Sequence, residues 1–261
     1  LIRSDQIGPV TFRQLLARFG TAEAALQAIP DLSRRGGGRM PRLMSQAEAA
    51  AEADAVAGLG ARYLFLGQGL YPPALAQVDT APPVLIVKGQ AALLDKPMVA
   101  IVGARNASAA ACRYARQLAQ DLGDAGLAVV SGMARGIDTA AHQGALATGT
   151  IGAIAGGIDV PFPPENAPLH EEVGTRGLLI AEQPPGSEPK SRHFPRRNRI
   201  IAGLALGTLV IEAAPRSGSL ITARCAAEFG REVMAVPGSP LDPRAQGCNQ
   251  LIREGATLVQ T

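Results

Sequence analysis

The sequence has 261 residues, which is enough for one large α/β domain and a small accessory domain. A hydrophobic fraction of 47% and a charged fraction of 18% exclude a disordered chain, and a net charge of +3 does not by itself indicate a nucleic-acid partner. The cysteines lie far apart and no apolar run reaches the roughly 20 residues of a membrane span, so we expect a cytoplasmic protein with no metal, no cofactor and no membrane partner.

Residues 1–60 have the pattern of a small helical domain. The first helix is expected to end at Gly20, and Thr21 is placed to cap the second helix. The segment 30–41 is rich in glycine, proline and arginine, which predicts a loop. A third helix, rich in Ala and Glu, is expected over 46–56.

From residue 61 onward, short apolar runs alternate with helical patterns, the latter clearest over 108–122, 138–148 and 219–229. Most runs lack a polar face, which is typical of strands in a parallel sheet that helices cover on both sides. We therefore predict an α/β fold: an extended Rossmann-like, doubly wound and mostly parallel sheet over 61–261, with the all-α domain before it. The expected strands are 63–66, 84–87, 99–102, 127–130, 152–155, 178–181, 208–211, 233–236 and 257–259.

Three loops that follow predicted strands, 103–108, 131–138 and 212–219, are candidates for ligand binding. Each combines glycine, a hydroxyl and an arginine at the start of a helix, where free backbone N–H groups favour an anion. The same residue types also serve as ordinary turns and helix caps. Their repetition along one sheet edge favours an anion site, with phosphate as the expected anion.

The segment 190–199 is the most basic part of the chain, with five Lys or Arg residues, no acid, and Phe194 in its middle. A basic track with an interleaved aromatic suits single-stranded nucleic acid, because cations follow the backbone while a base stacks on the ring. The alternative is that Phe194 belongs to the core and that the arginines form a solvated or ion-paired face.

The sequence offers no convincing catalytic group. It lacks the phosphate-binding, nucleophile-elbow and zinc-protease motifs, and its three histidines are scattered. Asp138 and His142 stand one helical turn apart, for which capping and packing are better explanations than catalysis.

Six segments resemble, in order and spacing, the motifs of the DNA-processing protein A family (DprA, also called Smf). The resemblance runs from about Tyr71 to Ala256 and is weaker in the N-terminal helices. The segments are 99–105, 130–142, 194–203, 210–219, 236–238 and 247–255.

The resemblance implies a sterile-alpha-motif-like N-terminal domain, a homodimer, and a recombination mediator rather than an enzyme. Such a protein binds and protects incoming single-stranded DNA and loads the RecA recombinase during natural transformation, with single-strand-binding protein as a further partner. It also implies that Arg105 contacts the DNA backbone and that Phe194 stacks on a base. The residues expected to bind DNA are Gly103, Arg105, Ser108, Ser131, Gly132, Arg135, Lys190, Arg192, Phe194, Arg196, Arg197, Asn198, Arg199, Ser217, Gly218, Ser219 and Thr222.

Two features depart from the family pattern. Ser191 stands where some members carry a DNA-contacting lysine, so Lys190 or Arg192 is expected to take that role. Many members continue into a winged helix, whereas this sequence ends at Thr261; either this member lacks that domain or the sequence omits it.

Other readings stay open at this point. A nucleotide-binding Rossmann enzyme of the phosphoribohydrolase type would use Glu212 on a ribose, but the double glycine of its loop is missing and Glu212 is equally placed to cap a helix. A pure interaction scaffold would lack nucleic-acid affinity. The segment 7–9 also suggests a helix-hairpin-helix contact to a DNA backbone, against simple packing.

Overall fold

The computed structural model describes residues 1–37 and 40–261, and its N-terminal part is a small helical domain. The predicted end of the first helix and the predicted starts of the second and third are confirmed: Gly20 caps the first helix, the Thr21 hydroxyl accepts a backbone N–H of the second, and a Ser45–Glu48 capping box starts the third. The helices are α1 (Pro9–Phe19), α2 (Ala22–Arg35) and α3 (Gln46–Gly58).

The loop predicted over 30–41 begins later than expected, because α2 continues through Pro30 to Arg35. A proline inside a helix costs about 3 kcal/mol. Here Ile29 is buried and Leu32 packs beside it in the small N-terminal core, so burial of this face offsets the lost hydrogen bond. Residues 38 and 39 of the predicted loop lie outside the described residues.

The described residues form one nine-stranded sheet in the order β1-β2-β6-β5-β4-β3-β7-β8-β9. Strands β3 to β9 pair in parallel, whereas β2 pairs antiparallel with both β1 and β6 at one edge. The prediction of a mostly parallel, Rossmann-like sheet is therefore confirmed, and each expected strand is present within two or three residues of its predicted ends. The strands are β1 (Arg62–Phe65), β2 (Val84–Gly89), β3 (Met98–Gly103), β4 (Ala128–Ser131), β5 (Thr150–Ile154), β6 (Leu178–Ala181), β7 (Gly207–Ile211), β8 (Glu232–Ala235) and β9 (Thr257–Leu258).

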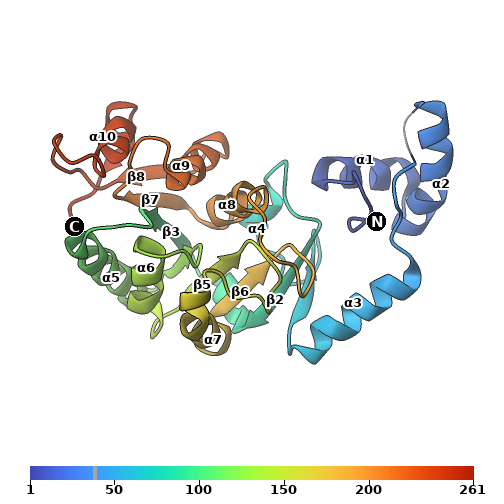
Figure 1. Cartoon of the computed structure of the whole chain (residues 1–261), viewed down its shortest axis with the longest axis horizontal. Helices are drawn as coiled ribbons and strands as arrows, with labels where there is room; N and C mark the ends of the chain where they lie inside the picture. The colour runs from blue at the N-terminus through green and yellow to red at the C-terminus, as the bar shows by residue number, and fades with distance from the viewer. Residues whose placement is uncertain (38–39) are drawn as a thin grey trace.

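Helices cover both faces of the sheet (Figure 1). On one face lie α4 (Pro73–Ala76), α8 (His193–Leu204), α9 (Gly218–Glu228) and α10 (Gln246–Arg253). On the other face lie α5 (Ala109–Asp124), α6 (Ile137–Ala145) and α7 (Ala167–Arg176). Two short 3-10 turns lie in the connections: η1 (Ala91–Asp95), which packs into the core on the α8 face, and η2 (Pro164–Asn166). Within the described ranges, no helix combines the length and apolarity that crossing a bilayer requires.

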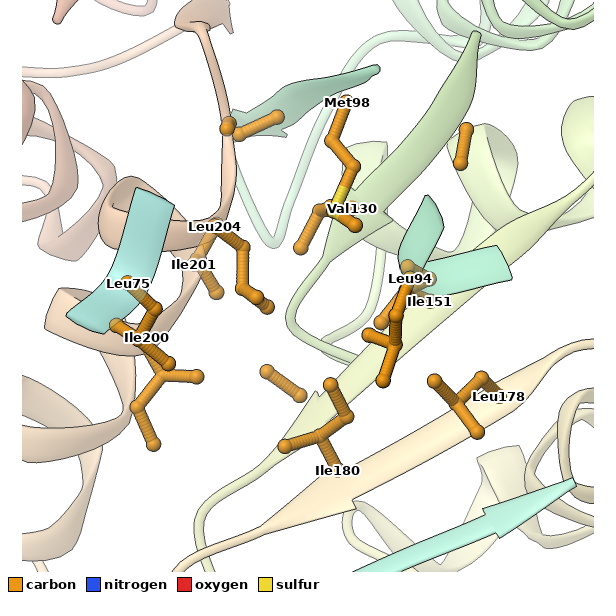
Figure 2. Packing of buried hydrophobic residues seen from close by; sticks show 14 of the residues in the cluster. Leu75, Leu94, Met98, Val130, Ile151, Leu178, Ile180, Ile200, Ile201 and Leu204 are labelled. Atoms are coloured by element: carbon orange, nitrogen blue, oxygen red, sulfur yellow. The ribbon is translucent and has the colours of Figure 1, made fainter. Parts of the chain in front are cut away.

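The strands are apolar on both sides because successive side chains enter different cores. Ala100 and Val102 of β3 face the core that contains α8, whereas Ile101 between them packs against α5 and α6. Figure 2 shows the first of these cores, with Ile200, Ile201 and Leu204 of α8 near the sheet and with Val130, Ile151 and Ile180 on the strands. This packing holds α8 firmly over the sheet.

A partly buried polar network joins the N-terminal domain to the sheet. The Arg3 guanidinium pairs with Glu52 at 2.9 Å and donates a hydrogen bond of 2.7 Å to the Glu182 carbonyl. Tyr63 on β1 donates to the same Glu52 carboxylate at 3.0 Å. The predicted division at residues 60 and 61 falls between α3 and β1, and it stays a prediction.

Candidate nucleic-acid interface

A cavity of about 780 Å³ opens where the strand order reverses. The chain runs from β3 to β6 on one side of β3 and from β7 to β9 on the other, so the loops after β3 and β7 diverge and leave a crevice. Residues 102–106 and 214–222 line opposite sides of it, and α8 contributes the third wall. The pattern of loops in the sequence thus predicted the edge of the sheet on which the cavity lies.

Glu212 links the loop after β3 (103–108) to the loop after β7 (212–219). Its carboxylate accepts hydrogen bonds from the Ser108 hydroxyl (2.6 Å) and the Ser108 backbone N–H (2.8 Å). Ser108 is also the N-cap of α5. Of the two roles considered for Glu212, helix capping is therefore the one that its position supports, and Ser108 is engaged within the protein.

Backbone strain is concentrated in these loops. Met133, Glu212 and Arg216 have positive φ values of 59°, 51° and 67° although none is glycine. Such conformations cost roughly 1–3 kcal/mol each and persist mostly where function requires them. Met133 follows β4, and Glu212 and Arg216 follow β7, so the strain lies at the carboxyl edge that holds the cavity.

Arg197 is a buried cation in the cavity lining, with only 6% of its surface exposed. It donates hydrogen bonds to the carbonyls of Gly132 and Ala153, the latter at 2.9 Å, and to the Asn198 side chain at 3.1 Å. Burial lowers the Arg197 pKa to about 10, so the group stays charged at neutral pH. Among the described residues, no ion pair within 4.0 Å includes Arg197.

Asp138 is the carboxylate whose charge most supports Arg197. It accepts the backbone N–H groups of Gly132 (3.1 Å) and Ala134 (3.3 Å), and thereby shapes the second loop. Burial raises the Asp138 pKa, while the Arg197 charge and these hydrogen bonds act in the opposite direction. The cavity floor therefore carries a cation that the protein compensates only at a distance.

The basic segment 190–199 is divided by a helix that the sequence analysis did not predict. Because α8 begins at His193, the exposed basic residues Arg192 and Arg196 lie on one side, while Arg197 points inward. Arg199 is held by Glu182 (2.6 Å) and the Thr80 carbonyl (2.6 Å). Of the two interpretations of this segment, DNA track or ion-paired face, Arg199 fits the second, because the protein itself engages its guanidinium.

Phe194 stands at the mouth of the cavity and is half-buried, between the two alternatives of core residue and exposed ring. The Arg105 guanidinium carbon lies over its ring, 5.5 Å from the centroid. Phe162, from the connection between β5 and η2, contacts the same ring with centroids 5.5 Å apart and planes tilted by 55°. The residues predicted to contact the backbone and the base are thus adjacent.

Comparison with known protein families identifies the family of this chain. Residues 62–261 match the family model described as DNA recombination-mediator protein A, and residues 1–55 match the DprA-like N-terminal HHH domain. The chain belongs to the DNA-processing protein A family. The predicted resemblance and a helical N-terminal domain are therefore confirmed, and the matched description agrees with the helix-hairpin-helix alternative raised for the segment 7–9.

Individual relatives agree with this assignment. DNA processing protein DprA of Streptococcus pneumoniae is 48% identical over 191 residues, covering 72% of this chain and 67% of that protein. Protein Smf of Escherichia coli is 42% identical over 192 residues, covering 72% of this chain and 51% of that protein. The chain thus spans between half and two thirds of these relatives.

Two solved structures of the family share the fold. The X-ray structure of DprA from Streptococcus pneumoniae has a TM-score of 0.78 and 34% identity, covering 98% of this chain and 96% of that chain. A structure of DNA processing protein A from Helicobacter pylori, which concerns the single-stranded DNA binding mode of that protein, has a TM-score of 0.71 and 28% identity. It covers 77% of this chain and 92% of that chain.

The structure brings only part of the predicted DprA site into the cavity. The predicted residues that line it are Gly103, Arg105, Phe194, Arg197, Asn198, Ser217, Gly218, Ser219 and Thr222. Those outside the lining but exposed are Arg135, Lys190, Arg192 and Arg196. Ser131 is fully buried and donates to the Ile101 carbonyl at 2.6 Å, so its predicted DNA contact is corrected to a bond between β4 and β3.

The predicted site glycines of this DprA family member differ in the space around them. A side chain at Gly103 would collide with the Ile211 carbonyl, and one at Gly132 would meet Arg197 and Asp138. These two positions are glycine because of packing. Gly218 has nothing within 4 Å of where its Cβ would lie, so the space beside it in the cavity is open to a ligand.

Sequence reasoning missed several lining residues. Arg216 was seen in the third loop but not chosen, although it is exposed at the cavity, and Arg244 reaches it from before α10, where it pairs with Asp242 at 2.9 Å. Arg244 is a lone arginine among turn residues, so its local sequence gives no indication that it reaches the cavity. Phe162, which contacts Phe194 without lining the cavity, did carry a signal, since aromatics are only 3% of this chain.

The remaining candidates for catalysis have structural roles. His142 is fully buried and its Nδ1 lies 2.7 Å from the Thr150 hydroxyl, while Asp138 caps the second loop. This agrees with the expectation of capping and packing. Within the described ranges, no three His, Cys, Asp or Glu side chains gather as metal ligands.

Proposed function

We propose that this DprA family member binds single-stranded DNA at the cavity and acts as a recombination mediator that loads RecA. The observation that carries the proposal is Arg197, a buried cation without a carboxylate at contact distance, facing a cavity beside the N-terminus of α9. Burial of a cation costs several kcal/mol, and the Asp138 charge offsets only part of that cost for Arg197. A phosphate oxygen at the cavity floor would offset this cost.

The N-terminus of α9 supplies the other half of a phosphate site. Ser217 caps the helix, and its hydroxyl lies 2.8 Å from that of Ser219. Thr222 follows one turn later and also lines the cavity. Hydroxyls and first-turn N–H groups are suited to phosphate oxygens, and the helix dipole favours negative charge.

Unpaired bases are the expected ligand because an aromatic ring lies at the cavity mouth. Phe194 offers stacking to a base, which a base inside a duplex cannot accept. Arg105 beside it, together with the exposed Arg192 and Arg196, would follow the backbone. Contacts to phosphates and ring faces tolerate any sequence, so we expect little base preference.

The mediator role, rather than an enzymatic one, rests on the same residues. Glu212, the carboxylate that a phosphoribohydrolase would need free, is occupied by Ser108. Loading of RecA, protection of incoming DNA, cooperation with single-strand-binding protein and a homodimer are inferred from family membership.

The test is a fluorescence-anisotropy titration of labelled oligo-dT at two salt concentrations, with Gly218→Ala as the central variant. The added methyl group meets no protein atom but occupies the space proposed for phosphate. Loss of a charge-assisted contact of about 1.5–3 kcal/mol corresponds to roughly 10- to 150-fold weaker binding. Gly58→Ala, at the end of α3 and equally free of neighbours, is the matched control and should bind like wild type.

Arg105→Ala and Phe194→Ala complete the series. Both should weaken binding, and wild-type affinity should fall as salt rises. Normal binding by Gly218→Ala, with an unchanged melting temperature, would show that the phosphate site is not at α9. Absence of binding by wild type would refute the proposed function and would lead to assays of nucleotide hydrolysis.

A further inference from the structure

Phe162 is an exposed aromatic residue that the site described above does not use. It is 43% exposed, on the connection that follows β5 at the carboxyl edge of the sheet, and it does not line the cavity. Together with Phe194 it forms an aromatic pair that is open to solvent beside the cavity.

Phe194, by contrast, already has neighbours on its ring. Arg105 lies over it at 5.5 Å and Phe162 lies against it at 5.5 Å, and the residue is only partly exposed. The more open aromatic surface of this cluster, defined as Arg105, Phe194 and Phe162, belongs to Phe162. A strand that leaves the cavity past Phe194 meets this ring next.

We propose that Phe162 is a second base-stacking platform, which directs the strand from the cavity toward the connection between β5 and α7. This inference rests on the proposed DNA-binding function and specifies the path of the DNA. Bases stack on any exposed aromatic face, so the platform adds affinity without sequence preference.

The charges around Phe162 agree with a nucleic-acid strand. Glu165 is paired with Arg135, and the Asp159 carboxylate accepts the Gly186 backbone N–H at 2.8 Å. The nearby acids are thus each engaged by a donor. An apolar side chain of a protein partner is the other possible occupant, and the experiment separates the two.

The experiment compares Phe162→Leu, Phe162→Trp and wild type in binding to oligo-dT and to an abasic oligomer of equal length. Leucine keeps an apolar contact for Phe194 but cannot stack. We expect Phe162→Leu to bind oligo-dT at least about fivefold more weakly, Phe162→Trp to bind as well as wild type, and the abasic oligomer to bind all three equally. Phe65→Leu is the matched control, because Phe65 is a 46% exposed aromatic that stacks on Tyr63 on the edge strand β1.

Photo-crosslinking of wild type with oligomers that carry 5-iododeoxyuridine gives a second measurement. We expect a crosslinked peptide that contains Phe162. Unchanged oligo-dT affinity of Phe162→Leu, while Gly218→Ala still loses binding, would overturn the platform and leave the proposed function intact. Equal weakening on both oligomers would also overturn it, as would crosslinks confined to Phe194, and failure of wild type to bind either oligomer would overturn the function itself.

Discussion

His142 makes the stability of this protein depend on pH in a way that can be calculated from its position. His142 belongs to α6 and its ring is fully buried, and burial lowers its pKa from 6.5 to about 3. Thr150 donates its hydroxyl to the Val129 carbonyl at 3.2 Å, so His142 Nδ1 donates to Thr150. Among the described residues the buried Nε2 has no hydrogen-bond partner, so a second proton there would be unsatisfied and the neutral ring is the form that fits.

The sign and size of this change in stability with pH follow from proton linkage. Because the folded-state pKa lies below the unfolded value, the unfolded chain binds more protons between these two values. The contribution of His142 to stability is present above pH 6.5 and is lost as the pH falls toward 3. The loss approaches about 1.4 kcal/mol per pH unit, or about 2 kcal/mol between pH 7.5 and pH 5.

The perturbation is His142→Asn, which does not titrate and places an amide donor near the Nδ1 position. Urea unfolding of both proteins at pH 7.5 and pH 5 measures the difference. Burial also lowers the pKa values of His170 and His193, but both proteins keep these groups, so their effects cancel. We expect the free energy of unfolding to fall by about 2 kcal/mol more in wild type than in the variant.

A lower stability of His142→Asn at both pH values would leave the comparison unaffected, because a cavity beside Thr150 lowers the free energy of unfolding by the same amount at each pH. The reasoning would be refuted if the two proteins lost the same free energy of unfolding between pH 7.5 and pH 5, within about 0.5 kcal/mol. The ring would then titrate as an ordinary histidine.

Two further substitutions test the site. Glu165→Gln frees the exposed Arg135 from its ion pair, so single-stranded DNA should bind more tightly at low salt. The slope of log affinity against log salt should become steeper by up to about 0.7, and an unchanged slope would place Arg135 off the DNA path. Gly103→Ala forces a methyl group against the Ile211 carbonyl, so urea unfolding should show a loss of about 1–3 kcal/mol, whereas Gly58→Ala should show none; equal stability of the two would contradict the packing role of Gly103.

Local patterns in the sequence were sufficient for the strands, for most of the longer helices and for the edge of the sheet that carries the site. Buried parallel strands are apolar on both faces, so each of them stands out as a short run bounded by turns. The same holds for Thr21 and Ser108, whose capping chemistry acts within three residues. The position of the cavity followed from these elements, because the loops after parallel strands gather at one edge.

The family resemblance added what these patterns could not, namely the DNA-processing role and the separate roles expected of Arg105 and Phe194. The helix α8 was missed because its basic run obscured the spacing of Ile200, Ile201 and Leu204, which is helical. Without that helix, Arg196, Arg197 and Arg199 looked equivalent, although one is exposed, one is buried at the cavity and one is bound to Glu182.

Only the tertiary structure decided which of these side chains meets which partner. Ser108 and Glu212 are 104 residues apart in sequence, Arg197 and Gly132 are 65 apart, and Phe162 reaches Phe194 from a different loop. Hydrogen bonds, ion pairs and ring contacts act over a few ångströms, so their partners are set by the packing of helices on the sheet and not by neighbours along the chain. The direction in which a side chain points, and hence whether an arginine supports the fold or faces a ligand, is therefore a property of the folded protein.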